Sequence, residues 1–252
     1  FFVHYASLHS CTKTAPYAAQ ATSALALRES MKYLIILILL PLAVMADEST
    51  CYGTTSNGSL KDGVKLPSSG SNFEGYSSIA SIAGRTYVHS TVRDIIVTSY
   101  KSLEFEHPEK DFKYAETGFK EGGQFKPHKT HRNGLSVDFM VPVVNENGES
   151  VHLPTSLLNK FGYNIEFDQN AKYEQYQIDF EAMAAHIVSL HKETKRRGYD
   201  LWRVIFDPEL RPYLFKTKYA EYLLKNIQFS KKRSWVRHDE HYHIDFEIPC
   251  KS

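Results

Sequence analysis

The stretch Pro127-His-Lys-Thr-His-Arg-Asn-Gly-Leu-Ser-Val-Asp-Phe139 contains two histidines and then enters a strand with two different faces. From Leu135 to Val143 the residues alternate, so that Leu, Val, Phe and Val face one side while Ser, Asp and Met face the other. The apolar side must be buried, and Asp138 therefore points away from the core. An Asn-Gly turn before the strand allows His131 to fold back towards Asp138.

A second alternating strand begins within the stretch His238-Asp-Glu-His-Tyr-His243, near the end of the sequence. From Tyr242 to Ile248 its apolar residues face one side, and His241 and His243 face the other. If the two strands share a sheet, their histidines and Asp138 project from the same side. We therefore expect a zinc site in a groove on the polar face of this sheet.

The rest of the sequence mixes helical and strand patterns without a regular βαβ period. Apolar residues at helical spacing predict helices at 88–103, 178–197 and 209–224. Further strands are predicted at 112–116, 164–168 and 201–206. The segment 52–72 is rich in Gly, Ser, Asn and Thr, which predicts turns rather than regular structure. The class that fits is α+β, with a largely antiparallel central sheet flanked by helices.

Histidines are concentrated where the two strands begin. Five of the twelve histidines fall in the two quoted stretches, and imidazole and carboxylate groups are ligands that suit zinc. Three protein ligands with an open fourth position are typical of a catalytic zinc site, in which the metal activates water. The spacing leaves open whether His241 or His243 is a ligand, because both lie on one strand face. His186 and His191 lie along a predicted helix and are expected to be structural.

Composition excludes several other functions. The chain has 30 basic and 29 acidic residues, so no basic excess is present to neutralise the phosphates of a nucleic acid. The His-Glu-x-x-His motif of helix-borne zinc peptidases does not occur, nor does the Gly-x-Ser-x-Gly motif of serine hydrolases. The sequence therefore favours a metal centre on strands over these alternatives.

Residues 31–46 have the pattern of a secretory signal peptide. A basic start precedes an apolar run from Leu34 to Leu42, and small residues follow at the expected cleavage site. The run is too short for a stop-transfer helix, although an uncleaved membrane anchor is the rival interpretation. We interpret residues 1–30 as an upstream extension and residues 47–252 as the exported domain, without a stable membrane span after cleavage.

The cysteines support export. Cys51 and Cys250 lie near the two ends of the predicted domain, whereas Cys11 lies in the upstream extension. In an exported chain such a pair favours a disulfide, and the alternative is two free thiols. The bridge would close nearly the whole domain into one loop.

The histidine motifs resemble those of a known family. His131-x6-Asp138 with a late His241-x-His243 resembles the zinc peptidase group of D-Ala-D-Ala peptidases, lysostaphin-like enzymes and hedgehog-type domains. With His128 and His238 included, the pattern resembles the penicillin-insensitive murein endopeptidases, and the likeness covers most of residues 47–252. The sequence departs from that family at two places, with an acid at 245 where a basic residue is expected and an unfamiliar stretch at 144–177.

The resemblance implies roles for these residues. It implies that zinc is bound by three ligands, His131, Asp138 and His243. It implies that His241 acts as general base or stabilises the oxyanion, and that His128 and His238 are support residues near the metal. The implied activity is D,D-endopeptidase cleavage of D-alanyl–diaminopimelate cross-links of peptidoglycan in the periplasm.

Two other functions stay open at this point. One is a D,D- or L,D-carboxypeptidase that trims peptidoglycan stem peptides, and the other is a non-catalytic, metal-stabilised wall-binding module. The sequence leaves the oligomeric state open. It also does not rank four arginines that are able to bind a substrate carboxylate: Arg85, Arg132, Arg203 and Arg237.

Overall fold

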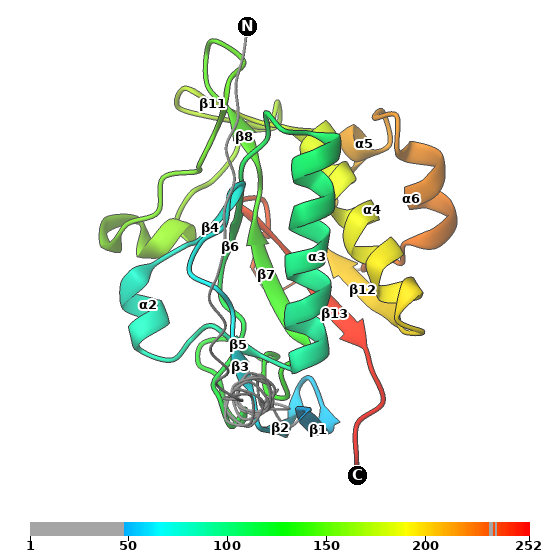
Figure 1. Cartoon of the computed structure of the whole chain (residues 1–252). Coiled ribbons are helices and arrows are strands. Elements are labelled where there is room, and N and C mark those ends of the chain that lie inside the picture. The colour runs from blue at the N-terminus through cyan, green and yellow to red at the C-terminus, as the bar shows by residue number, and fades with distance from the viewer. Residues whose placement is uncertain (1–47, 232–233, 235) are drawn as a thin grey trace, which may run out of the picture. The chain divides into compact units, whose positions relative to one another are not determined.

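A five-stranded mixed sheet lies at the centre of the part of the chain that the computed structural model describes, residues 48–231, 234 and 236–252 (Figure 1). Its strands follow the order β12 (Asp200–Ile205), β13 (His241–Glu247), β7 (Ser136–Met140), β6 (Phe112–Tyr114) and β4 (Phe73–Gly75). Neighbouring strands are antiparallel except β4 and β6, which are parallel. The predicted α+β class is confirmed, and the central sheet is mixed.

The two alternating strands share the central sheet and are direct neighbours, which meets the condition on which the predicted site depends. In the register of β7 and β13, His243 lies opposite Asp138, and Tyr242 lies opposite Phe139. The rings of Phe139 and Tyr242 stack with centroids 5.5 Å apart on the core side. Both faces of β7 are buried, because loops cover the side that bears Asp138. The polar face is therefore more enclosed than the alternation alone suggests.

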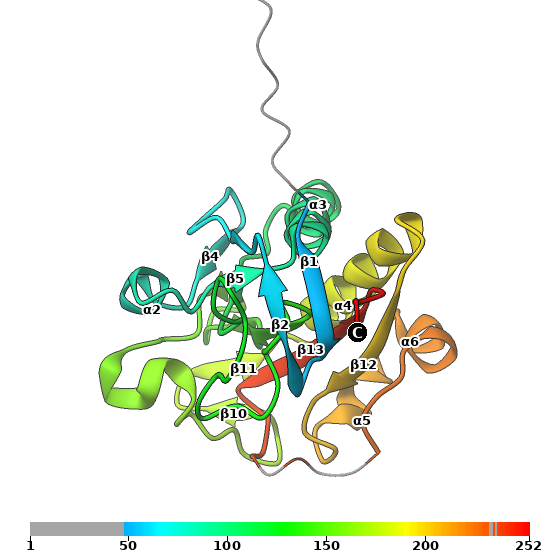
Figure 2. The ribbon, with the colours of Figure 1, turned by 90° about the horizontal axis from the view of Figure 1, so that it is seen from below.

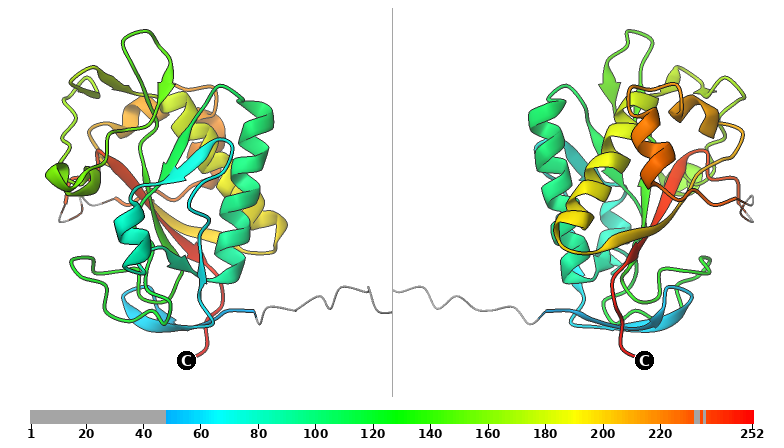
Figure 3. Two further views of the ribbon diagram at one scale, coloured as in Figure 1. Left: turned by 60° about the vertical axis from the view of Figure 1, so that its left-hand side comes forward. Right: turned by 90° about the vertical axis from the view of Figure 1, so that its right-hand side faces the viewer.

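Two long helices, α3 (Ser90–Glu106) and α4 (Phe180–Arg196), pack side by side against the apolar face (Figures 1 and 3). Helix α4 begins where the Asp179 carboxylate accepts a hydrogen bond from the amide of Ala182, an N-cap interaction. His186 of α4 is fully buried against Phe139 and Tyr242. This position confirms the structural role expected for His186.

The remaining helices are short. They are α2 (Ser78–Ile82), the 3-10 helix η1 (Leu157–Gly162), α5 (Arg211–Leu214) and α6 (Ala220–Asn226). The prediction of one helix over 209–224 is wrong, because the chain leaves helical geometry between α5 and α6. The strand predicted at 164–168 is also wrong, since this segment forms turns and irregular structure.

Three small sheets complete the fold. Strands β1 (Thr50–Thr54) and β2 (Asn57–Lys61) form a hairpin, and β3 (Val64–Lys65) pairs with β5 (Tyr87–Val88). A four-stranded sheet has the order β10 (Lys172–Tyr173), β11 (Tyr176–Ile178), β8 (Val143–Val144) and β9 (Ser150–Val151). The prediction that 52–72 lacks regular structure is therefore wrong.

The predicted disulfide is confirmed. The sulfur atoms of Cys51 and Cys250 are 2.07 Å apart, and the bond joins residues 199 positions apart in sequence. The amide of Lys251 also donates to the Cys51 carbonyl at 2.9 Å, so the β1–β2 hairpin and the C-terminal segment lie side by side (Figure 2).

The predicted signal peptide, residues 31–46, and the predicted upstream extension, residues 1–30, lie outside the described residues. Their boundary with the domain 47–252 stays a prediction. Among the residues that the structure describes, no helix has the length and apolar character needed to cross a membrane.

Candidate metal centre

The carboxylate of Asp138 is the centre of the histidine cluster. Asp138 is fully buried on β7. Its Oδ1 atom lies 2.8 Å from Nδ1 of His243, on the adjacent strand, and 3.2 Å from Nε2 of His131. The ring centroids of His131 and His243 are 4.8 Å apart. The two strands and the preceding loop therefore bring these three residues together, as the sequence predicts.

The turn before β7 holds His131 in place. The His131 backbone has a φ of 65°, in the left-handed region that side chains other than glycine seldom adopt. Gly134 completes the turn with a φ of 78°, and a Cβ at this position would lie 2.7 Å from the amide nitrogen of His89. His131 donates from Nδ1 to the Thr117 carbonyl at 3.0 Å. Its buried Nε2 has no hydrogen-bond partner among the described residues.

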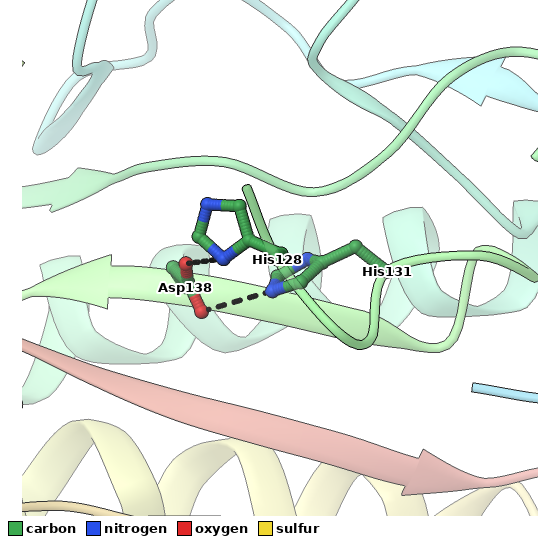
Figure 4. A group of neighbouring side chains, drawn as sticks. All are labelled: His128, His131 and Asp138. Atoms are coloured by element: carbon green, nitrogen blue, oxygen red, sulfur yellow. Dashed lines mark ion pairs between the residues drawn. The ribbon is translucent and has the colours of Figure 1, made fainter. Parts of the chain in front are cut away.

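His128 reaches the other oxygen of Asp138 (Figure 4). Its Nδ1 lies 3.8 Å from Asp138 Oδ2, and its Nε2 lies 2.5 Å from Glu116 Oε2. One ligand atom from each of His128, His131 and Asp138 can be chosen so that the three lie within 4.8 Å of one another, a spacing that allows one metal ion to contact all three. The resemblance implies only a support role for His128, whereas this geometry makes it a candidate ligand.

His241 approaches the same oxygen from β13. Its Nε2 lies 3.8 Å from Asp138 Oδ2, and its Nδ1 donates to Glu240 Oε1 at 2.7 Å. His238 packs against the His241 ring with centroids 4.5 Å apart and donates from Nδ1 to the Val236 carbonyl. No direct contact is recorded between His238 and Asp138 in the described part of the chain. His238 thus lies behind His241.

The four histidines around Asp138 share one arrangement. Each directs one ring nitrogen to an oxygen outside the cluster and the other towards Asp138. The outer oxygens belong, for His128, His131, His241 and His243 in turn, to Glu116, Thr117, Glu240 and Asp245. Histidines that bind metals usually donate their second N–H to a carboxylate or a backbone carbonyl, which fixes the tautomer. Together with the unpartnered His131 nitrogen, this arrangement fits a divalent cation.

Charges in the cluster are tightly coupled. Burial would raise the pKa of Asp138, but His131 and His241 hold it well below its ordinary value. Burial lowers the pKa of His131. Burial would also lower the pKa of His243, but the Asp245 and Asp138 carboxylates raise it to about 10. Without a metal, His243 therefore holds a proton between two carboxylates, and a cation at its Nδ1 must displace that proton.

Two residues that bond the cluster, Tyr163 and Glu116, were not predicted from the sequence. The hydroxyl of Tyr163 lies 2.9 Å from Asp138 Oδ2, yet Tyr163 belongs to the unfamiliar stretch 144–177, where no motif marks it. Glu116 also gave no signal in sequence, although it bonds both His128 and Arg85. Burial would raise the pKa of Glu116, but these two hydrogen bonds lower it to about 2. Among the glutamates that bond the histidines of the cluster, Glu240 lies inside the quoted stretch His238–His243, and Glu116 does not.

A cavity of about 730 Å³ opens beside the cluster. Four histidines of the two motifs line it, His128, His238, His241 and His243, together with Tyr163. Four basic residues also line it: Arg85, Lys129, Lys160 and Arg203. Two acidic residues, Glu116 and Glu240, line it as well. A cavity of this size can enclose a small molecule or a peptide segment.

A cluster of buried imidazoles around one carboxylate, beside a cavity, defines a candidate centre for metal-assisted chemistry. The family model of the penicillin-insensitive murein endopeptidases matches residues 51–252. The chain belongs to this family, and membership implies murein endopeptidase activity on the peptidoglycan of the cell wall. The comparison with curated proteins gave no significant match.

Proposed function

We propose that this protein is a zinc-dependent D,D-endopeptidase that hydrolyses the D-alanyl–diaminopimelate cross-links of peptidoglycan. Membership of the murein endopeptidase family supports the substrate class. The single observation that supports a metal most strongly is the convergence of ring nitrogens on Asp138, one of them the unpartnered Nε2 of His131. This nitrogen lies 3.2 Å from Asp138 Oδ1 but makes no hydrogen bond among the described residues. A buried polar atom without a hydrogen bond costs about 1–3 kcal/mol, which a bound cation would relieve.

In this proposal zinc is held by His131 Nε2, Asp138 Oδ1 and His243 Nδ1. The short distances from Asp138 Oδ1 to the two imidazoles, 3.2 and 2.8 Å, support this set. His128 is a further candidate, since its Nδ1 also faces Asp138. The ion would supply a Lewis acid for the scissile carbonyl and the attacking water.

The remaining residues bind and transfer protons. His241 donates from Nδ1 to Glu240, which leaves Nε2 to accept a proton from the attacking water and to return it to the leaving amine. Burial would lower the pKa of His241, but Glu240 and Asp138 raise it above its ordinary value, so these two carboxylates stabilise the imidazolium that forms when His241 accepts the proton. We assign His238, which packs on this ring, to the support of the site. The family resemblance gives His128 the same role, and the alternative is that His128 is a further ligand.

Digestion of purified peptidoglycan tests the activity. The protein should convert cross-linked muropeptide dimers to monomers, lose this activity with a chelator and regain it with zinc. Chromatography of the digest separates this outcome from carboxypeptidase activity, which shortens monomers and leaves dimers intact. Full activity in metal-free protein would contradict the zinc proposal, and metal-bound protein that only binds wall fragments would indicate a binding module.

Three alanine variants test the ligand assignment. His243→Ala should lose bound zinc, whereas His241→Ala should keep zinc and lose turnover, because His241 is assigned to proton transfer. His128→Ala decides whether this imidazole is a ligand or a support residue. Zinc content by elemental analysis is the measurement, and equal zinc retention in the His241 and His243 variants would refute the assignment.

We also infer that the protein works in the periplasm after removal of residues 31–46. The signal-peptide pattern and the Cys51–Cys250 disulfide support export, since disulfides persist in oxidising compartments. Mass spectrometry of the periplasmic protein should give an N-terminus at Asp47. A protein recovered only from the membrane would indicate an uncleaved anchor instead.

A further inference from the structure

The four arginines that could bind a substrate carboxylate differ in whether they line the cavity and in whether their guanidinium groups are already bonded. Arg237 is held by several carboxylates, among them Asp207 and Asp239, and does not line the cavity. Arg132 does not line it either. Arg85 lines the cavity, but its guanidinium bonds Glu116 through two nitrogens and the Lys126 carbonyl. These three guanidinium groups are occupied or distant from the cavity.

Arg203 is the remaining arginine, and it lines the cavity. It donates from Nε to Asp245 Oδ2 at 2.6 Å. Its terminal nitrogens make no hydrogen bond to a residue within the described part of the chain. The Arg203 side chain is 28% exposed and contributes to the cavity wall, so it can be contacted by a ligand there.

A β-bulge directs Arg203 towards the cavity. In the register of β12 with β13, Leu201 lies opposite Phe246 and Arg203 lies opposite Asp245, so Trp202 is an extra residue. Without the bulge, positions 201 and 203 would share a face, because strand side chains alternate. With it, Leu201 enters the core and Arg203 faces the metal cluster. Bulges that redirect a side chain in this way are frequent next to active sites.

The guanidinium is held rigidly relative to the cluster. Asp245 is fully buried, and its carboxylate also accepts hydrogen bonds from Ser136 at 2.6 Å and from His243 Nε2 at 2.9 Å. Because Arg203 lies opposite Asp245 on the neighbouring strand, it is a diagonal same-face neighbour of His243, at about 7–8 Å. The guanidinium group also lies over the Trp202 ring, with its carbon 4.3 Å from the ring centroid. A substrate whose carboxylate contacts Arg203 can therefore place a bond only a few atoms away from that carboxylate at the metal cluster.

We propose that Arg203 binds the carboxylate that diaminopimelate bears on the carbon next to the scissile nitrogen. This inference rests on the proposed function. Diaminopimelate is an amino acid at both ends, so the end whose amine is acylated by D-alanine keeps its own carboxylate free. Arginine suits this group, because its planar fork matches a carboxylate with two parallel hydrogen bonds. Arg203 therefore selects the residue on the amino side of the cleaved bond.

The test compares two cross-linked stem-peptide dimers that differ only at this carboxylate, one with the free acid and one with the carboxamide. The zinc-loaded wild-type protein should prefer the acid at least tenfold in kcat/KM, mainly through KM. This factor corresponds to about 1.4 kcal/mol. Arg203→Gln, which keeps a donor for Asp245 but removes the charge, should cleave both peptides equally well. The ratio of kcat/KM for the acid to that for the carboxamide is compared within each variant, so a loss of zinc or of stability affects both values equally and does not change the ratio.

Lys160→Ala is the matched control, since Lys160 is an exposed cation on the same cavity and should leave the preference intact. Should Arg203→Gln not fold, Arg203→Lys retains a cation for Asp245 and should still reduce the preference, because an ammonium group cannot form the fork. An acid preference that survives at Arg203→Gln would overturn the proposal, as would its loss at Lys160→Ala alone. Cleavage of neither peptide by zinc-loaded wild type would instead contradict the proposed function itself.

Discussion

His186 couples the stability of the site to pH. It lies under the strands that bear the metal cluster, on their core side, among the rings of Tyr100, Phe112, Phe139 and Tyr242. It is fully buried, and its Nδ1 shares a 2.5 Å hydrogen bond with the Tyr242 hydroxyl. Burial lowers the pKa of His186 from 6.5 to about 3. The folded protein therefore keeps this imidazole neutral where the unfolded chain protonates it.

The sign and size of the effect follow from proton linkage. Below pH 6.5 the unfolded chain binds a proton at His186 and the folded protein does not, so acid stabilises the unfolded state. The contribution is negligible above pH 7 and grows by about 1.4 kcal/mol per pH unit as the pH falls towards 3. Between pH 7 and pH 5 His186 should lower the free energy of unfolding by about 2 kcal/mol.

His186→Asn isolates the contribution of His186 protonation to the free energy of unfolding, because it keeps an acceptor for the Tyr242 hydroxyl and removes the titratable group. The variant should be less stable at pH 7, since a smaller side chain leaves a cavity. Its loss of stability between pH 7 and pH 5 should nevertheless be about 2 kcal/mol smaller than that of wild type. Urea unfolding in excess chelator measures both values without a contribution from zinc binding.

The matched control is His107→Asn. His107 also bonds a tyrosine hydroxyl, that of Tyr219 at 2.9 Å, but it is only partly buried at the end of α3. This variant should not show the reduced pH dependence expected of His186→Asn, because it leaves His186 in the core unchanged. If His186→Asn and wild type lose the same stability between pH 7 and pH 5, His186 is not the buried neutral group that we describe.

Three further predictions concern single contacts. Asp245→Asn should weaken zinc binding 10- to 100-fold in chelator competition, because the outer partner of His243 is altered; unchanged affinity would count against His243 as a ligand. Replacing Cys51 and Cys250 by Ser should lower the free energy of unfolding by about 5 kcal/mol at most, since the bridge closes a loop of about 200 residues; a loss below about 1 kcal/mol in denaturant titration would contradict this estimate. Tyr163→Phe should weaken zinc binding by about 1 kcal/mol through loss of its hydrogen bond to the central carboxylate, and calorimetric titration with zinc would detect no change if that bond is unimportant.

The strand alternation explains why the core of the site was predictable. Side chains on a strand alternate between two faces, so the face of one residue determines the faces of all the others. The apolar residues around Asp138 and His243 therefore also indicate where these two side chains point. Their pairing across β7 and β13 followed from the need to bury both apolar faces together. The partners of the histidines were not predictable, because Glu116 and Tyr163 reach the cluster from segments with no periodic relation to it.

The β1–β2 hairpin shows how a glycine can mislead. Asn57-Gly58 is a turn signal within the segment 52–72, yet both residues begin β2, and the turn is formed by the two preceding residues. Gly58 lies opposite Gly53, and a Cβ at Gly58 would lie 2.3 Å from the Tyr52 carbonyl oxygen. Glycine is needed there because two backbones approach closely, a tertiary requirement that looks like a turn signal in sequence.

The acid at position 245 illustrates the same limit inside the site. Along β13, Asp245 departs from the basic residue expected two positions after His243. The sheet places Arg203 directly opposite Asp245, and the two side chains form an ion pair. A guanidinium is thus present beside the cluster, supplied by the neighbouring strand, and Asp245 holds both Arg203 and His243. Asp245 and Arg203 act as a cross-strand pair, so the role of one residue can be understood only together with the residue opposite it on the neighbouring strand.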